Sequence, residues 1–412
     1  MKALFEGNLP PHDKQFLRQF LTKERVMQLA DDDIEKLHQA SEMGDAYAQY
    51  AYGRWLYLYN PYDGALADAE KLFFASKDIV PDSLAVYAQM LRYGETEITH
   101  PSAIDIEKSQ QMTEEAISRG SELGALNWAR HHIFGNFCQA EPAQIAEEIE
   151  QRLRNHPDSD PSWYNMLAYA YEELDRQDDA IQSYEKAIAQ GELNAYSNLA
   201  FLYMKRGNMA LYEEYMEEGL EKRAGGCYIY QADINDEDFD ELPEAEQQQL
   251  HQTIDERLRL GLKKGEGLCA YYLWLHNYYG GLGYTEDTTM AFSYLKRGVQ
   301  LTCTACITQM AMEVQDYGIP GQTITATDKA ELWLKAARYA PYNEEALYYL
   351  QHVNDPAFLL KHKEELERYW QPLFPQEPIS PESSTIDSKP WTPIDPSDII
   401  KDDDDGRYDA WA

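Results

Sequence analysis

The chain is poor in basic residues for its size. Its 412 residues include 36 Lys and Arg against 72 Asp and Glu, so the formal net charge is −36. Free nucleic acid is bound by a basic surface that neutralises its phosphates, and docking on an anionic membrane has the same requirement. The charge therefore argues against nucleic acid and against anionic membrane surfaces as partners.

Cysteines and long apolar runs are also scarce. The five cysteines are too few, and odd in number, for a disulfide framework. The lack of such a framework favours the reducing cytoplasm as the compartment of the protein. Residues 1–11 lack the apolar core of a signal peptide, and no stretch approaches the roughly 18 apolar residues of a membrane span. We expect a cytoplasmic protein whose hydrophobic residues, 44% of the chain, supply a large core.

Sequence motifs of catalysis are absent as well. The His-Glu-x-x-His zinc motif, the phosphate-binding loop, the Gly-x-Ser-x-Gly elbow and the dinucleotide fingerprint do not occur. Cys303 and Cys306 could form half of a zinc or redox site, but no second pair of ligands follows them. Packing between helices is the simpler interpretation of the two cysteines. We expect no cofactor, no metal and no enzymatic activity.

The segment 160–191 carries a regular pattern of small and large residues. With Pro161 as position 1, large residues occupy positions 4, 7, 11 and 24, and small residues occupy positions 8, 20 and 27. These residues are Tyr164, Leu167, Tyr171, Tyr184, Ala168, Ala180 and Ala187. The pattern resembles the tetratricopeptide (TPR) repeat, in which small residues let two antiparallel helices approach closely, although Glu192 replaces the expected proline.

Two further segments resemble the Sel1-like repeat, a relative of the TPR with a longer loop between its helices. Residues 44–53 resemble its opening helix, with Gly53 at the close-packing position, and residues 267–283 add a Gly-x-Gly loop. The small-residue position recurs about every 37 residues from Gly53 to Ala346, with a degenerate marker around 225–233. The resemblance implies an all-α, right-handed superhelical solenoid of about nine antiparallel helix pairs.

The pattern and the composition divide the chain into five segments. We expect N-terminal capping helices at 1–41, repeats at 42–232, an acidic loop at 233–246, repeats at 247–370 and a tail rich in Pro and Asp at 371–412. The capping helices would shield the open face of the first repeat, as solenoids require. The eight acids of the loop are either solvated or a contact for a basic partner, and they lack the pattern of a calcium-binding loop.

The tail differs in kind from the rest of the chain. Seven of the 19 prolines fall in residues 371–412, so helix cannot persist there, and we expect the tail to be extended or disordered. It nevertheless carries Trp391, Tyr408 and Trp411 beside the acids at 402–405. Two interpretations stay open: the tail folds back along its own groove, or it is a linear motif for another protein.

Candidate binding residues follow from the family resemblance. In TPR solenoids the first helix of each pair lines the concave groove. Carried onto this sequence, the groove positions give Tyr47, Tyr50, Arg54, Tyr57, Asn165, Tyr169, Asn194, Phe201, Lys205, Tyr272 and His276. The candidate acidic and tail contacts are Asp236, Asp238, Asp240, Trp391, Asp402, Asp403 and Trp411.

Three functional hypotheses follow. The leading one is a non-catalytic protein–protein interaction scaffold that binds a protein or peptide, possibly basic, in a groove rich in tyrosine. The second is a bacterial immunity protein that neutralises a basic toxin, because helical-repeat chains resemble a class of such proteins and acidity speeds association with a basic partner. The third, least favoured, is an enzyme whose site, for example Cys303 and Cys306, is built on the solenoid.

Overall fold

The structure is a computed structural model that describes residues 9–98, 104–319, 323–341 and 343–370. The predicted tail, with Trp391, Asp402, Asp403 and Trp411, lies outside the described residues. The helices are α1 (Pro11–Arg18), α2 (Lys23–Met27), α3 (Asp31–Glu42), α4 (Ala46–Tyr59), α5 (Ala65–Ser76), α6 (Pro81–Tyr93), α7 (Ile106–Ser118), α8 (Glu122–Phe134), α9 (Pro142–Asn155), α10 (Ser162–Glu172), α11 (Gln177–Ala189), α12 (Asn194–Lys205), α13 (Met209–Lys222), the 3-10 helix η1 (Gly225–Ile229), α14 (Asp236–Asp240), α15 (Glu244–Lys263), α16 (Gly267–Tyr279), α17 (Thr288–Gln300), α18 (Thr304–Asp316), α19 (Ala326–Tyr339), α20 (Glu344–Gln351), α21 (Pro356–Lys361) and α22 (Lys363–Trp370).

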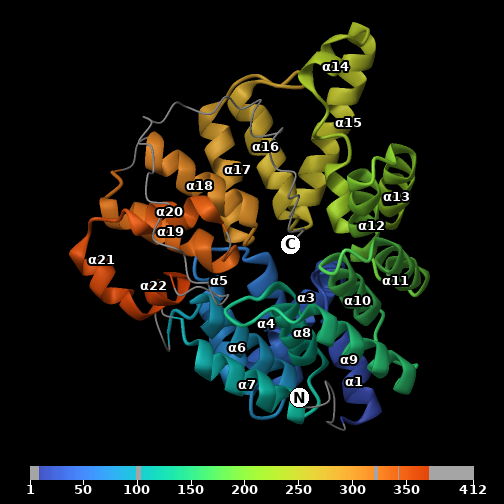
Figure 1. The fold of residues 1–412 in the computed structure, drawn as a ribbon, viewed down its shortest axis with the longest axis vertical. Coiled ribbons are helices and arrows are strands. Elements are labelled where there is room, and N and C mark those ends of the chain that lie inside the picture. Colours follow the sequence, from blue (N-terminus) through green and yellow to red (C-terminus); the bar gives the residue numbers. More distant parts are fainter. Residues whose placement is uncertain (1–8, 99–103, 320–322, 342, 371–412) are drawn as a thin grey trace, which may run out of the picture.

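Consecutive helices pack as antiparallel pairs, which we call units. The first to eighth units are α4/α5, α6/α7, α8/α9, α10/α11, α12/α13, η1/α15, α16/α17 and α18/α19, and α20 with the short α21 and α22 ends the series. Figure 1 shows the units stacked into a curved superhelix, in which α8, α10 and α12 lie nearer the centre than α9, α11 and α13. The predicted all-α solenoid of about nine helix pairs is confirmed.

The first helix of the sixth unit is reduced to a short 3-10 helix, η1. Only η1 remains of it, packed against α12, α13, α15 and α16. A Cβ on Gly225 would lie 2.1 Å from Glu266 Oε1, and a Cβ on Gly226 would lie 2.4 Å from Ser197 Oγ. The two glycines allow this close approach, but adjacent glycines also disfavour a regular α-helix. The degenerate marker predicted around 225–233 therefore corresponds to a real irregularity of the solenoid.

Three cysteines pack where the second helix of one unit meets the first helix of the next. Each follows a glycine by eight residues, and a Cβ on that glycine would lie 2.1–2.4 Å from the cysteine Sγ. The pairs are Gly219 with Cys227, Gly261 with Cys269, and Gly298 with Cys306. The thiols thus fill the positions that small residues hold between helices, as the packing interpretation of Cys306 expected. All five cysteines are free.

The expected acidic loop at 233–246 is only partly a loop. Residues 236–240 form α14, and α15 begins at Glu244, so the prediction of a loop was wrong for these residues. The Asn235 side chain accepts a hydrogen bond from the Glu237 amide at 3.0 Å and caps α14. Acids in the first turn interact favourably with the positive end of the helix dipole, so the acidic run supports a helix start.

The superhelix closes on itself, so that late units touch the first ones (Figure 1). Arg297 at the end of α17 donates to the carbonyl of Tyr59, the last residue of α4, at 2.8 Å and to the carbonyl of Asn60, the next residue, at 2.7 Å. Its guanidinium also lies 4.9 Å from the centre of the Tyr59 ring. The Asn60 amide in turn donates to the carbonyl of Gln300 at 3.1 Å. These contacts join the first and seventh units.

Substitution Arg297→Ala should loosen this closure. Hydrogen bonds to charged groups contribute about 1.5–3 kcal/mol, so we expect the free energy of local opening at the α4–α5 turn to fall by about that amount. Hydrogen exchange at residues 59–64 should accelerate and the radius of gyration should grow, with helical circular dichroism unchanged. Arg206→Ala, which removes the exposed pair with Asp178, is the matched control. Unchanged exchange at the turn would show that Arg297 does not hold the ends together.

Candidate partner-binding surface

A row of polar side chains crosses the first helices of four successive units. Asn127 on α8 donates to Gln89 on α6 at 2.9 Å. Asn198 on α12 donates to Asn165 Oδ1 at 3.0 Å and to the Tyr169 hydroxyl at 2.8 Å, both on α10. We call these five residues the amide row. The structure therefore brings the predicted groove residues Asn165 and Tyr169 together.

The predicted residues of α12 lie beside the amide row. Asn194, at the helix start, and Phe201, further along, are partly buried, and Lys205 at the helix end is exposed. Burial raises the pKa of Glu172 on α10, although the hydroxyl of Tyr184 and the ammonium of Lys205 oppose the shift. This side of α12 therefore combines amides, an aromatic ring and one exposed ammonium near a partly buried carboxyl.

In the first unit the predicted groove residues contact the chain's own N-terminal segment. Arg54 is buried and donates to the carbonyl of Phe20 at 3.1 Å and to the next carbonyl at 3.3 Å. The Tyr50 ring lies edge-on to Phe20 at 6.0 Å, and the Tyr47 ring lies edge-on to Phe16 at 5.6 Å. These three side chains line a surface that α1 and the following turn already cover.

The N-terminal segment reaches well beyond the first unit. The helix α3 packs against α4, as a cap should, but α1 and α2 extend to later units. Arg18 bonds to Glu122 at the start of α8 at 2.7 Å. Arg25 bonds to Asp160 before α10 at 2.8 and 2.9 Å, and to Glu192 before α12 at 3.1 Å. Carboxylates at the starts of three first helices, α8, α10 and α12, thus bind the arginines of the N-terminal segment.

Tyr57 lies at the closure of the superhelix. Its hydroxyl donates to Glu95 Oε2 at 2.6 Å, and the hydroxyl of Tyr339 on α19 donates to the other oxygen of the same carboxyl. The Tyr339 ring also stacks on Tyr93 at 5.1 Å with 9° between the planes. Burial raises the pKa of Glu95 despite these hydroxyls. Tyr57 therefore connects the first and eighth units through one buried carboxyl.

His276 and Tyr272 sit on α16. His276 is buried, and its Nε2 lies 2.9 Å from the carbonyl of Ala232. Burial lowers the pKa of His276 to about 4, so its ring is neutral at pH 7 and Nε2 donates to this carbonyl. The ring stacks on Tyr284 at 5.2 Å, while Tyr272 remains partly buried nearby. His276 fixes the segment that follows η1 to α16, and Tyr272 is the more accessible of the two.

The predicted acidic contacts have different surroundings. Asp236 accepts from the Leu282 amide at 3.0 Å, and a Cβ on Gly281 would lie 2.8 Å from the same carboxylate oxygen. Asp236 therefore fastens the Gly-x-Gly loop of the seventh unit. Asp238 and Asp240 are exposed on α14, which projects from the body of the superhelix (Figure 1).

Three exposed tyrosines lie near the ends of late first helices, and the groove positions carried over from the TPR include only one of them, Tyr279. Tyr279 on α16, Tyr317 after α18 and Tyr348 on α20 are 52%, 79% and 58% exposed. Tyr317 and Tyr348 fall outside the groove positions taken from the TPR. The available signal was an aromatic residue in the second half of a first helix, or directly after it, in three successive units.

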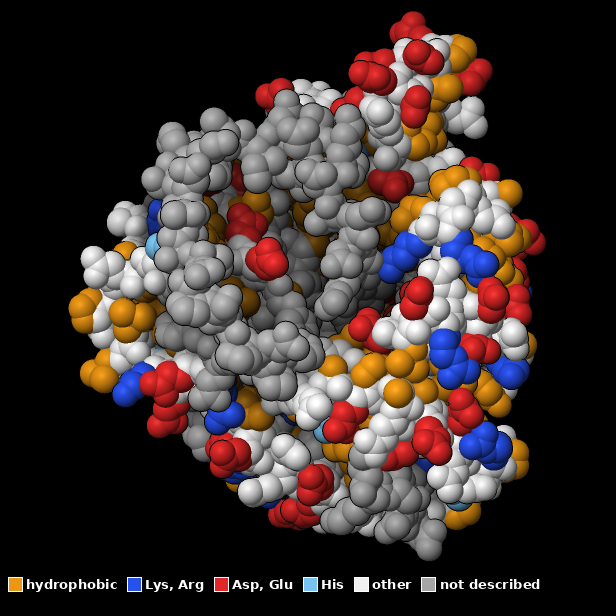
Figure 2. All heavy atoms as spheres, viewed as in Figure 1, with side chains coloured by type: hydrophobic (Ala, Val, Ile, Leu, Met, Phe, Trp, Pro, Cys, Tyr) orange, Lys and Arg blue, Asp and Glu red, His pale blue; other side chains and the backbone are white. Residues whose placement is uncertain are grey.

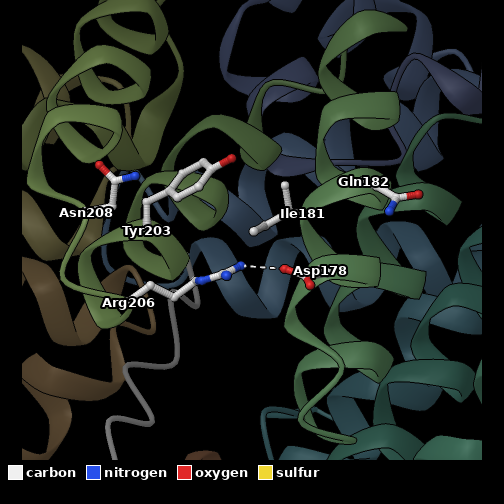
Figure 3. Close-up of a pocket in the computed structure, with 6 residues that line it drawn as sticks. All are labelled: Asp178, Ile181, Gln182, Tyr203, Arg206 and Asn208. Carbon is white, nitrogen blue, oxygen red and sulfur yellow. Dashed lines mark hydrogen bonds and ion pairs between the residues drawn. The ribbon is translucent and has the colours of Figure 1, made fainter.

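A surface pocket lies between α11 and the end of α12. It has a volume of about 600 Å³ and is lined by Asp178, Ile181, Gln182, Tyr203, Arg206 and Asn208. Figure 3 shows Arg206 reaching across to Asp178, which it bonds at 2.8 Å. The one ion pair drawn in the pocket is thus made within the chain, which is typical of a groove between neighbouring units.

Within the described ranges, no group of three or more His, Cys, Asp or Glu side chains is arranged to hold a metal ion. Cys303 and Cys306 are both buried, and burial raises the pKa of the Cys306 thiol. Among the helices of the described residues, none combines the length and the apolar character needed to span a bilayer.

No protein-family model and no curated protein sequence matches the chain. The helix pairs, their small-residue contacts and the Gly-x-Gly loop nevertheless define the architecture. The described residues form an all-α solenoid of stacked helix pairs, and the sequence pattern resembles those of Sel1-like and TPR repeats.

Three solved structures illustrate this similarity. One is c5321, a protective antigen of uropathogenic Escherichia coli with an SLR fold, at 17% identity over 77% of this chain and 74% of that one, with a TM-score of 0.33. A Sel1 repeat protein from Oxalobacter formigenes is 14% identical over 86% and 97%, with a TM-score of 0.35. The Cut9–Hcn1 hetero-tetramer of the APC/C matches at 14% identity over 81% and 62%, with a TM-score of 0.41. These low scores add nothing on function.

Proposed function

We propose that this chain is a non-catalytic scaffold that binds a protein or peptide along the inner side of its solenoid. The observation that carries the proposal is the amide row, which continues from α6 through α8 and from α10 to α12 with Phe201 and Lys205 beside it. Asn127, Asn165 and Asn198 are only 7–8% exposed and bond neighbouring first helices, so the row fixes the inner side on which the more exposed Phe201 and Lys205 would meet a bound segment. Stacked helix pairs present such rows as extended binding surfaces.

Photo-crosslinking tests this proposal directly. A photoreactive phenylalanine analogue placed at Phe201 should crosslink to a partner in cells, and mass spectrometry would identify that partner. The same analogue at Met209, an exposed residue on the second helix α13, is the matched control and should give no crosslink. Crosslinks from position 209 alone, or from neither position, would contradict binding on the inner side.

A further inference from the structure

The N-terminal segment, residues 11–27, lies across the first helices of the solenoid as a bound peptide would. Four of its apolar side chains, those of Leu17, Phe20, Leu21 and Val26, are only 0–4% exposed and belong to the main core. Leu17, Phe20 and Leu21 have the i, i+3, i+4 spacing by which an amphipathic segment anchors in a groove. The segment therefore has the chemistry of a ligand that docks in a groove, although α1 and α2 are only 8 and 5 residues long.

Two arginines fasten this segment to carboxylates at the starts of first helices. Arg18 bonds to Glu122 at the start of α8 at 2.7 Å. Arg25 bonds to Asp160 before α10 at 2.8 Å and to Glu192 before α12 at 3.1 Å. The side chains of the three acids are 2–5% exposed, so these charge-assisted hydrogen bonds are held away from water. The arginines thus recognise a row of buried acids that spans the third to fifth units.

Arginines at the second helices α9 and α11 pair differently. Figure 2 shows Lys and Arg side chains over α9 to α13, interspersed with Asp and Glu. Arg154 pairs with Glu150, and Arg176 pairs with Asp179, in both cases within about one helical turn. These arginine side chains are 63% and 48% exposed, and exposed pairs of this kind contribute little to stability. The long-range pairs of the N-terminal segment therefore mark a built site and not an ordinary charged surface.

The end of α2 also reaches the seventh unit. A Cβ on Gly265 would lie 3.1 Å from Met27 Sδ, so α2 contacts the turn that leads into α16. The next residue, Glu266, caps α16 and is only 5% exposed. The segment therefore brings α2 beside a second buried carboxylate that none of its arginines binds among the described residues.

The fit of the segment is incomplete at three consecutive residues. Thr22 Oγ1, Lys23 Nζ and Glu24 Oε2 are buried, and none of the three atoms has a hydrogen-bond partner within the described part of the chain. Burial, and next the carboxylates of Glu266 and Glu192, raise the pKa of Glu24. Its own backbone amide and the ammonium of Lys23 oppose this shift. Buried polar groups without partners are costly, so this stretch weakens the hold of the segment on its own site.

We propose that residues 11–27 are a resident ligand of the inner side of the solenoid, and that a partner segment of the same chemistry displaces them. Such a segment carries two arginines seven residues apart with apolar residues between them, as Arg18 and Arg25 stand here. Each contact of the resident segment is then replaced by an equivalent one, and a partner without an acid at the position of Glu24 binds more tightly. The inference rests on the proposed function, because it names the chemistry of the partner that the scaffold receives.

A fluorescent synthetic peptide of residues 11–29 tests this proposal on the full chain. Fluorescence anisotropy should show weak binding to the wild type, because the resident segment occupies the site. Arg18→Ala with Arg25→Ala in the chain loosens that segment, so the apparent Kd of the peptide should fall about tenfold or more. A peptide that carries the same two substitutions should bind neither chain. Circular dichroism verifies that the double variant keeps its helices.

The variant Glu24→Gln in the chain should act in the opposite direction. The amide removes a negative charge beside Glu192 and Glu266, so the resident segment holds its site more firmly and the apparent Kd of the peptide should rise. Loss of folding cannot imitate this result, because the substitution relieves repulsion. The peptide with Glu24→Gln should in turn bind the arginine double variant about threefold or more tightly than the unchanged peptide does.

A control variant removes two arginines elsewhere. Arg154→Ala with Arg176→Ala breaks exposed local pairs and should change the apparent Kd by less than about twofold. Equal gains in binding from both double variants would show non-specific attraction of the peptide and overturn the site. An absence of binding to the Arg18 and Arg25 double variant with native helical content would overturn it too. So would an intermolecular crosslink from position 18 to α8 in a wild-type dimer, because the occupant would then be a second copy.

The two proposals fail separately. If position 201 crosslinks a partner while the peptide binds no variant, the scaffold function stands and the resident ligand is wrong. If the peptide binds as expected and no partner is captured at position 201, the site of residues 11–27 stands and binding beside the amide row is wrong.

Discussion

The substitution Glu122→Gln should lower the free energy of unfolding by about 3–5 kcal/mol at pH 7. Glu122 is 5% exposed and accepts from Arg18 Nε at 2.7 Å, Arg152 Nη2 at 2.8 Å and Trp163 Nε1 at 2.9 Å. A neutral amide leaves two guanidinium groups without their shared counter-charge, one of them buried. Removal of one partner from a buried ion pair is costly for this reason.

The pH dependence follows from the pKa of Glu122. Burial alone would raise it, but the hydrogen bond and charge of Arg18 and the charge of Arg152 outweigh burial and lower it. A lowered folded pKa gives stability that is present above the unfolded value of about 4.5 and is lost as pH falls through the folded value. The difference between wild type and Glu122→Gln should therefore shrink in acid.

Chemical denaturation at pH 7 and below pH 4 checks both expectations. Hydrogen exchange should also show faster exchange in residues 11–27, since Arg18 on α1 loses its bond to α8. Glu147→Gln, at an exposed residue of α9, is the control and should change stability by less than about 0.5 kcal/mol. An equally large loss in the free energy of unfolding at both pH values would show that the packing of the Glu122 side chain, and not its charge, provides the stability.

Sequence reasoning located the repeats because their signal is local and periodic. Ala168, Ala180 and Ala187 were assigned to close-packing positions, and all three are fully buried. The helix pairs follow from such spacing alone, since the small residues and their large neighbours lie within one unit. The short first helix of the sixth unit was also indicated by the sequence, because the small-residue position is degenerate around residues 225–233.

The long-range contacts that close the superhelix and fix the N-terminal segment could not be predicted from the sequence. Arg18 meets Glu122, and Arg297 meets Asn60, across more than a hundred residues of chain. Such contacts depend on how small rotations add up over many units, and no repeat position encodes that sum. The TPR groove positions assume an open concave face, so they could not show that Arg54 lies under the N-terminal segment.

The recurring spacing of eight residues between a glycine and a cysteine is visible in the sequence. It leads to the second large predicted change in stability, that of Gly219→Ala. Gly219→Ala adds a Cβ only 2.3 Å from Cys227 Sγ and 3.0 Å from Tyr196 Cβ. The gain in helix propensity is about 0.8–1.0 kcal/mol, whereas overpacking a core costs about 1–3 kcal/mol and sometimes more. Because a contact this short forces one helix away from the next, we expect a net loss of about 1–2 kcal/mol.

A double-mutant cycle separates the clash from other causes. Cys227→Ala removes the Sγ, so Gly219→Ala should be tolerated much better in that background, with a coupling energy of about 1–2 kcal/mol by denaturation. Gly124→Ala, where the nearest atom is the Ser121 hydroxyl at 3.1 Å, is the matched helical glycine and should cost far less. An additive cycle would mean that the thiol is not what requires the glycine. Strong coupling would establish the glycine and the cysteine as one packing unit, and the same spacing at 261 and 269 and at 298 and 306 would extend that rule to three successive joints of the solenoid.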